Sequence, residues 1–192
     1  MSTENEMDTH TKNTTSTIKE EIILPEETTA TYTDHILTIK GANGELSRIF
    51  NHPDITLALK DNTITIQCNR PRRKQKALVG TYHAHINNMI HGINVGFEYH
   101  MKTVYSHFPI KTSVQGTTFI IENFLGERSP RKAQILENVT VDIAGDMVTV
   151  KGIDKEKVGQ TVANIERATA VKRRDIRVFQ DGIYRIDRGG NT

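Results

Sequence analysis

The stretch ITLALKDNTITI, residues 55–66, decides the first half of the fold. Its apolar residues alternate with polar ones on both sides of the Asp61-Asn62 pair. This alternation is typical of two half-buried strands joined by a tight turn. The stretch VTVDIAGDMVTV, residues 139–150, repeats the pattern around the Gly145-Asp146 pair. The sequence therefore predicts two β-hairpins, one in each half of the chain.

A helical pattern follows each hairpin. The first apolar stripe, with spacings of three and four residues, consists of Val79, Tyr82, Ile86, Met89 and Ile93. The second stripe consists of Val158, Val162, Ile165 and Thr169. Residues at these spacings lie on one face of an amphipathic helix. We expect Pro71 in the first turn of the first helix and Asp154 as the N-cap of the second. Gly92 and Gly96 are expected to bound the far end of the first helix.

The chain repeats this order of elements about 82 residues later. The strand-like run Leu37–Ile39 corresponds to Phe119–Ile121, and Gly44-Glu45 corresponds to Gly126-Glu127. Generic strands could match by coincidence, but the shared order of strand, Gly-Glu turn, hairpin and helix favours a duplication.

These patterns predict an α+β fold of two tandem duplicated units, each a small antiparallel β-sheet with one α-helix packed on it. The second unit is expected to open with a strand from Phe97 whose alternation breaks after Met101, which a β-bulge would explain. The expected boundaries are a disordered N-terminal tail at 1–19, an N-terminal unit at 20–95, a C-terminal unit at 96–188 and a flexible C-terminus at 189–192.

Composition narrows the class of protein. The tail is rich in Ser, Thr, Asn and charge, so burial of apolar surface cannot offset its ordering entropy. It has no apolar central region, which excludes a signal peptide, and no run in the chain is long enough to span a bilayer. The single cysteine, Cys68, is expected to be a half-buried strand residue and excludes an internal disulfide. These features favour the cytoplasm.

Charge is sorted along the chain. It has 25 Lys and Arg against 23 Asp and Glu, yet residues 62–97 contain no acidic residue. The first basic group, with the polar stripe of its helix, is Arg70, Arg72, Arg73, Lys74, Lys76, His83 and His91. The second follows the second helix and consists of Lys172, Arg173, Arg174, Arg177, Arg185 and Arg188. The third is Arg128, Arg131 and Lys132.

Basic groups of this kind attract a polyanion, although an isolated basic run is as often a solvated face without a partner. Phe179 and Tyr184 lie within the second group and could either stack on bases or pack in the core. No element resembles a helix built to read base edges in a DNA groove. The pattern therefore favours recognition of the backbone and shape of folded RNA.

Signatures of catalysis are missing. The sequence lacks G-x-S-x-G, H-E-x-x-H and both glycine-rich phosphate motifs, and it offers no nucleophile beside a base. His83 and His85 are two residues apart, so they project from different faces of a helix and lack the spacing of metal ligands. We expect no enzyme activity, no metal and no cofactor.

Several motifs at ordered spacing resemble one known family. They are Thr38–Arg48 followed by His52-Pro53, Met89–Met101, Val104-Tyr105, His107–Pro109, Asn123–Glu127, Asp175–Arg177 and Asp181–Tyr184. Together they are similar to the universal large-subunit ribosomal protein six family, called protein nine in eukaryotes, in its archaeal and eukaryotic branch. The resemblance covers about residues 20–188, whereas the N-terminal tail extends beyond the usual start of the family.

The resemblance implies a duplicated α+β protein bound to large-subunit rRNA near the base of the stalk and the sarcin–ricin loop, where translational GTPases dock. It implies that neighbouring large-subunit ribosomal proteins are partners and that the C-terminal unit makes the main rRNA contact. Lys102 and His107 become weaker candidates for this contact. The alternative is a free-standing protein-interaction module whose exposed sheet edges add strands to a partner. Neither hypothesis involves a membrane or DNA.

Overall fold

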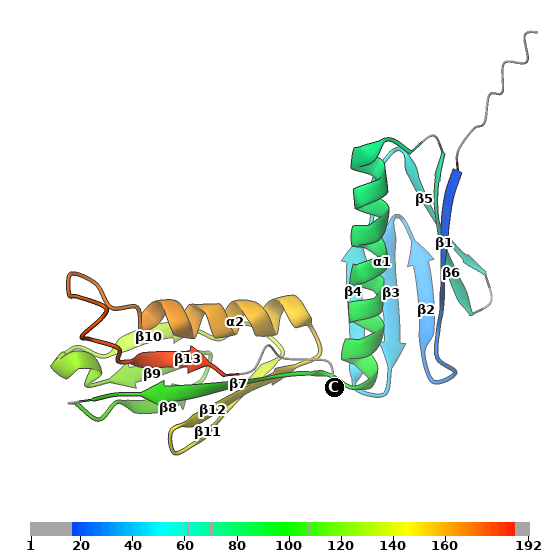
Figure 1. The fold of residues 1–192 in the computed structure, drawn as a ribbon. Coiled ribbons are helices and arrows are strands. Elements are labelled where there is room, and N and C mark those ends of the chain that lie inside the picture. The colour runs from blue at the N-terminus through cyan, green and yellow to red at the C-terminus, as the bar shows by residue number, and fades with distance from the viewer. Residues whose placement is uncertain (1–16, 61, 70, 107, 187–192) are drawn as a thin grey trace, which may run out of the picture.

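The computed structural model describes residues 17–60, 62–69, 71–106 and 108–186. Within these ranges the chain forms two α+β units whose long axes make an L (Figure 1). The first strand begins at Thr17, inside the segment predicted as a tail. Residues 1–16 of that tail, and the C-terminus from residue 187, lie outside the described residues.

The N-terminal unit has two antiparallel three-stranded sheets where the sequence predicted one. The first, in the order β1-β6-β5, consists of β1 (Thr17–Ile23), β6 (Thr63–Asn69) and β5 (Ile55–Lys60). The second, in the order β2-β3-β4, consists of β2 (Thr29–Thr33), β3 (Ile36–Gly41) and β4 (Gly44–Ile49). The predicted hairpin is confirmed as β5–β6, which pairs Lys60 with Thr63. The second sheet was missed because alternation reveals strands but not which strands pair.

Helix α1 (Arg73–Asn94) packs against both sheets of the N-terminal unit. The predicted stripe is its buried face, and Tyr82 at the edge of this stripe meets the Phe50 ring edge-on at 4.9 Å. Two details were wrong. Pro71 lies just before the helix, whose N-cap is Arg72, and Gly92 lies inside the helix instead of bounding it. Close packing of Gly92 against the second unit accounts for its position.

The C-terminal unit also has two antiparallel sheets. The four-stranded sheet, in the order β11-β12-β7-β13, consists of β11 (Val139–Ala144), β12 (Met147–Gly152), β7 (Phe97–Val104) and β13 (Gly182–Arg185). The other, in the order β10-β9-β8, consists of β10 (Arg131–Gln134), β9 (Thr118–Glu122) and β8 (Lys111–Gln115). Helix α2 (Lys155–Ala168) packs against both sheets of the C-terminal unit.

The C-terminal unit confirms two of the predictions and contradicts a third. The second hairpin is confirmed as β11–β12, with Ala144 opposite Met147. Asp154 is the N-cap of α2, and its Oδ1 accepts a hydrogen bond from the Glu156 amide at 2.9 Å. The bulge after Met101 is wrong, because β7 alternates without interruption to Val104 and pairs continuously with β12 and then β13.

The two units also differ at the Gly-Glu turn that suggested their duplication. Gly44 begins β4 directly after a tight turn, whereas Gly126 ends a 3-10 turn, η1 (Phe124–Gly126), that precedes a longer loop. Asn123 and Leu125 adopt left-handed φ values of 58° and 50° there. The second turn therefore matches the first in sequence but has a different conformation.

Each unit encloses its own apolar core. Cys68 is fully buried in the N-terminal core, deeper than the half-buried position predicted, and burial raises the pKa of its thiol. No helix within the described ranges is both long and apolar enough to cross a membrane. The same ranges contain no group of three or more His, Cys, Asp or Glu side chains placed to hold a metal ion.

Candidate nucleic-acid interface

The segment between α2 and β13 carries the first four residues of the second basic group, and its two ends are fixed to the same helix end. The Thr169 hydroxyl oxygen, at the C-terminus of α2, accepts a hydrogen bond from the Ile183 amide at 3.1 Å. One turn earlier, Glu166 Oε1 accepts a hydrogen bond from the Arg185 amide at 3.1 Å. Residues 170–181 therefore form a loop that projects from a closed, hydrogen-bonded base.

Three adjacent basic side chains occupy this loop, and we call Lys172, Arg173 and Arg174 the C-terminal basic cluster. All three are exposed, and none of them makes an ion pair with any described residue. The Arg173 backbone has a φ of 60°, a left-handed conformation uncommon for a residue with a side chain. The Arg174 guanidinium lies 4.9 Å from the centroid of the Phe179 ring.

Arg177 lies in the same loop but already has a partner. Its Nε and Nη2 donate to the two carboxylate oxygens of Asp175, at 3.1 and 2.9 Å. This bidentate contact lowers the pKa of Asp175 and raises that of Arg177. The Arg177 side chain is nonetheless 87% exposed, so phosphate would have to compete with a neighbouring carboxylate for it.

Arg131 is brought to this end of the unit but points inward. Its guanidinium donates to both carboxylate oxygens of Glu127, at 2.8 and 2.6 Å, and to the carbonyl oxygens of Ala168 and Ala170, at 2.9 and 3.1 Å. It also lies 4.1 Å from the centroid of the Phe124 ring. These contacts fasten β10 and the η1 turn to the end of α2, so Arg131 holds the base of the loop together.

The other two members of the third group are exposed beside Arg131. Arg128 lies in the loop after η1 and Lys132 lies on β10, and neither makes an ion pair within the described part of the chain. The structure therefore brings the C-terminal basic cluster and the third basic group to one end of the C-terminal unit.

Exposed apolar side chains lie among these basic residues, and sequence reasoning gave them no role in the site. Ile176 and Val178 are each 69% exposed in the loop of the C-terminal basic cluster. Phe108 is 45% exposed, and its ring lies against Gly126 at the η1 turn. The Phe-Pro motif at residues 108–109 was the only signal that could have suggested Phe108.

The aromatic residues of the second group have different environments. Phe179 packs against the C-terminal core and beneath Arg174. Tyr184 is 48% exposed on β13, where it pairs with Lys102 of β7, and its hydroxyl donates to the Gln180 carbonyl at 3.0 Å. Arg185 is exposed on the same strand, with its guanidinium 5.9 Å from the Tyr99 ring centroid.

The basic start of α1 is at the far end of the other unit (Figure 1). Arg72, Arg73, Lys74 and Lys76 are exposed at the start of α1 and make no ion pair with any described residue. His83 bonds with the Asn87 side chain at 3.2 Å, and His91 lies 5.1 Å from the Phe97 ring at the opposite end of α1. The two histidines are therefore separate from the basic start of the helix. The predicted site residues Arg70, His107 and Arg188 lie outside the described residues.

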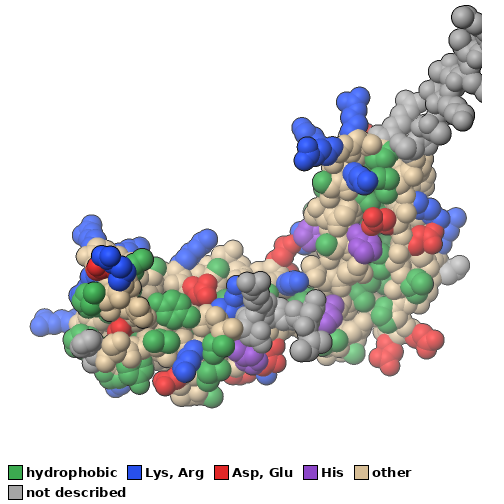
Figure 2. All heavy atoms as spheres, viewed as in Figure 1, with side chains coloured by type: hydrophobic (Ala, Val, Ile, Leu, Met, Phe, Trp, Pro, Cys, Tyr) green, Lys and Arg blue, Asp and Glu red, His purple; other side chains and the backbone are tan. Residues whose placement is uncertain are grey.

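Figure 2 shows Lys and Arg side chains at the far end of each unit, with further basic side chains and acidic ones scattered over the face between them. The start of α1 and the loop after α2, each with adjacent basic residues, thus lie at the two tips of the L. The chain's net charge of only +2 is consistent with binding through patches instead of through the whole surface.

Comparison with known proteins agrees with this architecture. The model of the family described as Ribosomal protein L6 matches residues 24–96 and 108–182, one stretch in each unit. The chain is 51% identical over 172 residues to a protein named large ribosomal subunit protein uL6 of Methanosphaera stadtmanae, covering 89% of this chain and 94% of that protein.

Two further archaeal relatives carry the same name. The protein from Methanobrevibacter smithii is 48% identical over 171 residues, which cover 89% of this chain and 96% of the relative. The protein from Methanococcus vannielii is 44% identical over 175 residues, which cover 91% and 96% respectively. With both units matched and this identity extending over nearly the whole chain, the protein belongs to the ribosomal protein L6 family.

Proposed function

We propose that this protein is a non-catalytic structural constituent of the large ribosomal subunit in cytoplasmic ribosomes. It binds large-subunit rRNA near the base of the stalk and the sarcin–ricin loop, and in this way supports translation. The observation that carries the proposal is the C-terminal basic cluster, three exposed cations without ion-pair partners among the described residues. Membership of a ribosomal, non-enzymatic family supports it.

The proposed mechanism is electrostatic. Lys172, Arg173 and Arg174 replace counterions on rRNA phosphates, and the released counterions favour binding at low salt. The base of the loop is fixed by Thr169 and Glu166 before RNA arrives, so little conformational entropy is lost on binding. Phe108, Ile176 and Val178 add apolar surface on which unpaired bases can stack or pack.

Other residues have secondary parts in the proposal. Arg177, Arg185, Arg128 and Lys132 extend the same surface, with Lys102 on the adjoining strand. The basic start of α1 makes a second contact, with rRNA or with a neighbouring large-subunit protein. Translational GTPases come close to this region of the subunit during their cycle without being a partner of the cluster itself.

The salt dependence of RNA binding tests the cluster. Replacing Lys172, Arg173 and Arg174 together with alanine should weaken binding to a large-subunit rRNA fragment about ten- to a hundred-fold at physiological salt. The slope of log affinity against log salt should fall by about 2, since each lost phosphate contact removes about 0.7–0.9.

A matched control changes the net charge equally but elsewhere. The variant K40A/K60A/K151A removes three exposed lysines outside the proposed surface and should keep the wild-type slope. Equal slopes for the cluster variant and the wild type would contradict the assignment.

Sedimentation distinguishes this proposal from the alternative of a free-standing interaction module. A structural constituent should co-migrate with large subunits at moderate salt. A module that uses exposed sheet edges should remain in the low-mass fractions with its protein partner.

A further inference from the structure

The two units meet at a joint made from the end of α1, the β3–β4 turn and the start of α2. Only Val95 and Gly96 separate the last residue of α1 from the first residue of β7. Their amides both donate to the His91 carbonyl oxygen, at 2.8 and 3.2 Å. The connection is therefore part of the C-terminal cap of α1 and leaves little free linker between the units.

A glycine allows the units to approach at backbone distance. Gly92, buried in the last turn of α1, faces the residue before the N-cap of α2. A Cβ at this position would lie 1.9 Å from the Ile153 carbonyl oxygen and 3.0 Å from the Phe97 ring. No side chain fits there without moving one unit away from the other. The Ile153 side chain also reaches the β3–β4 turn, within 3.5 Å of the place of a Cβ on Gly44.

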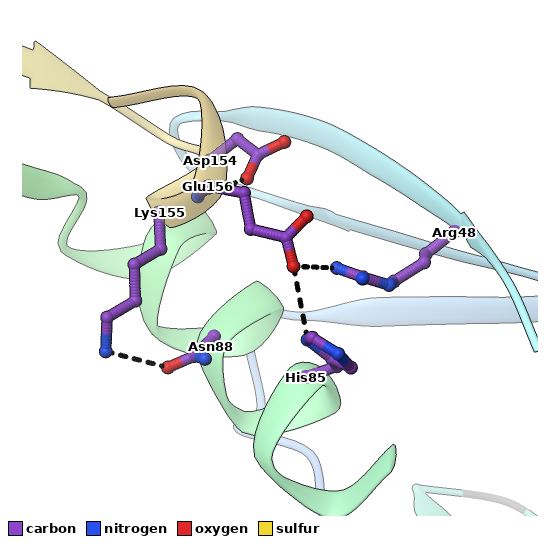
Figure 3. Close-up of polar contacts among 6 residues, drawn as sticks. All are labelled: Arg48, His85, Asn88, Asp154, Lys155 and Glu156. Atoms are coloured by element: carbon purple, nitrogen blue, oxygen red, sulfur yellow. Dashed lines mark hydrogen bonds and ion pairs between the residues drawn. The ribbon is translucent and has the colours of Figure 1, made fainter. Parts of the chain in front are cut away.

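A charged contact spans the cleft beside Gly92. Figure 3 shows the Glu156 carboxylate, in the first turn of α2, facing Arg48 from β4 and His85 from α1. Glu156 Oε1 lies 2.7 Å from Arg48 Nη1 and 3.5 Å from His85 Nδ1. One carboxylate of the C-terminal unit thus contacts two different elements of the N-terminal unit.

A second polar contact lies at the neighbouring residue. Lys155 Nζ is 3.4 Å from Asn88 Oδ1 and 5.5 Å from the centroid of the Phe97 ring. Partly exposed ion pairs are individually weak, so the polar contacts alone would not hold the units. Together with the backbone contact at Gly92, they restrain rotation about the joint in several directions.

We infer that this joint locks the two units into one rigid body, so that the two basic tips meet two separate RNA segments at a fixed spacing. The RNA half of this inference rests on the function proposed above, whereas the rigid joint does not. Once one tip has bound its RNA segment, the fixed spacing holds the other tip near the second segment. The second contact is then intramolecular, so the affinity of the whole protein for RNA exceeds that of either tip alone.

A distance measurement on the full chain, without RNA, tests the joint. Spin labels attached to Thr56→Cys and Gln115→Cys report across it, since both positions are exposed and lie in different units. Cys68 is buried with a raised pKa, so it should remain unlabelled. The expected result is one narrow distance distribution. A broad or multi-peaked distribution would overturn the inference.

Two variants and a matched control make the test specific. Gly92→Ala should shift and broaden the distribution, because the new Cβ cannot fit beside Ile153, while alanine favours the helix itself. Gly80→Ala makes the same change on the same helix, where a Cβ meets nothing within 4 Å, and should match the wild type. Glu156→Gln should broaden the distribution less than Gly92→Ala. Identical distributions for Gly92→Ala and Gly80→Ala would overturn the role of Gly92.

RNA binding then tests the spacing. Gly92→Ala should bind an rRNA fragment that carries both segments about ten-fold more weakly than Gly80→Ala, while the two bind single short segments equally well. If Gly92→Ala and Gly80→Ala bound the long fragment with equal affinity, the inference that fixed spacing strengthens RNA binding would be overturned. Failure of the cluster variant to alter RNA binding would instead contradict the proposed function, without touching the distance result.

Discussion

The two units share a hairpin-then-helix plan but differ after the helix. In the N-terminal unit, α1 ends at Asn94 and the chain passes directly into β7 of the next unit. In the C-terminal unit, a basic loop follows α2, and β13 then returns to pair with β7. The repeated part of each unit therefore supplies the scaffold, whereas the proposed RNA-binding loop lies where the two copies diverge.

The two helices also differ at their N-terminal ends. α2 begins with a side-chain cap from Asp154 and has Glu156 in its first turn. α1 begins at an N-cap, Arg72, that makes no side-chain cap bond, and its first turn has no acidic residue. Basic side chains at a helix N-terminus oppose the helix dipole and lower stability slightly. The start of α1 therefore has a composition that favours an anionic partner over helix stability.

The largest expected effect is in the two cores, where the units are alike. Ile66 of β6 and Ile165 of α2 are both fully buried. Truncating either to alanine should lower the free energy of unfolding by about 2–5 kcal/mol, through lost burial and the cavity left behind. Chemical denaturation followed by circular dichroism measures the change. A loss below about 1 kcal/mol at either site would show that the two cores are not equivalent.

The next effect distinguishes structural from binding arginines within one end of the C-terminal unit. Arg131→Ala should cost about 1–3 kcal/mol, because it leaves Glu127 and two carbonyls at the end of α2 without their donor. RNA salt dependence should stay at the wild-type slope in the folded variant, whereas the neighbouring Lys132→Ala should leave stability unchanged. A reduced salt slope in Arg131→Ala would show that it contacts phosphate.

The contact between Arg131 and Glu127 also makes the stability of the protein depend on pH. The side-chain hydrogen bond from Arg131, with its charge, lowers the pKa of Glu127 from the ordinary value of 4.5, although burial opposes this. The stabilisation is therefore complete above about pH 4.5 and is lost as the pH falls through the lower pKa of the folded state. In acid-denaturation experiments, Arg131→Ala should remove most of this acid-dependent loss, with a smaller part left from the nearby charge of Arg174.

A smaller effect concerns the two helix starts. Asp154→Ala should destabilise the protein by about 1 kcal/mol, as removal of an N-cap usually does. Arg72→Asp should have the opposite sign and stabilise by about 0.5–1 kcal/mol, because it supplies the cap that α1 lacks. Thermal denaturation compares the two variants. Destabilisation by Arg72→Asp would mean that Arg72 has a structural contact that the free protein needs.

The smallest effect is expected at His85 in the joint. Burial and then Arg48 lower its pKa from the ordinary 6.5, while Glu156 raises it. As the pH falls below 6.5, the unfolded chain takes up a proton that the folded state resists, so stability falls until the pH passes the lower folded pKa. His85→Gln should lack this decline between pH 7.5 and 5.5 in denaturation experiments. If the stability of His85→Gln fell with pH as much as that of the wild type, the decline would not come from His85.

Local elements of the fold could be predicted because their signals are local. The hairpins, both helical stripes and the Asp154 cap depend on residues within a few positions of each other. The second sheet of each unit and the return of β13 to β7 could not be predicted in this way. Pairing Ile183 with Thr103 joins residues 80 positions apart, and alternation says nothing about the partner.

The candidate site was predictable in composition but not in arrangement. Clusters of Lys and Arg are visible in the sequence, yet the inward orientation of Arg131 depends on Ala168 and Ala170, more than 35 positions away. The pairing of Arg177 with Asp175 could have been anticipated, since an acid two residues before an arginine in a loop readily bonds with it. The sequence predicted Gly92 at the end of the helix. The reason for a glycine there is its close packing against Ile153, which lies in the other unit and about 60 residues away in the sequence.

The order of strands around β7 has a consequence for synthesis of the protein. All strands of the N-terminal unit and α1 are complete once residue 94 has been made, so this unit can fold while the rest is still being translated. β7, made directly afterwards, must wait for β12 and then for β13 at residues 182–185. The loop that carries the C-terminal basic cluster is closed only by that last strand. In a nascent chain, the N-terminal unit would therefore fold early. The loop that is the main proposed RNA-binding site would be closed among the final steps.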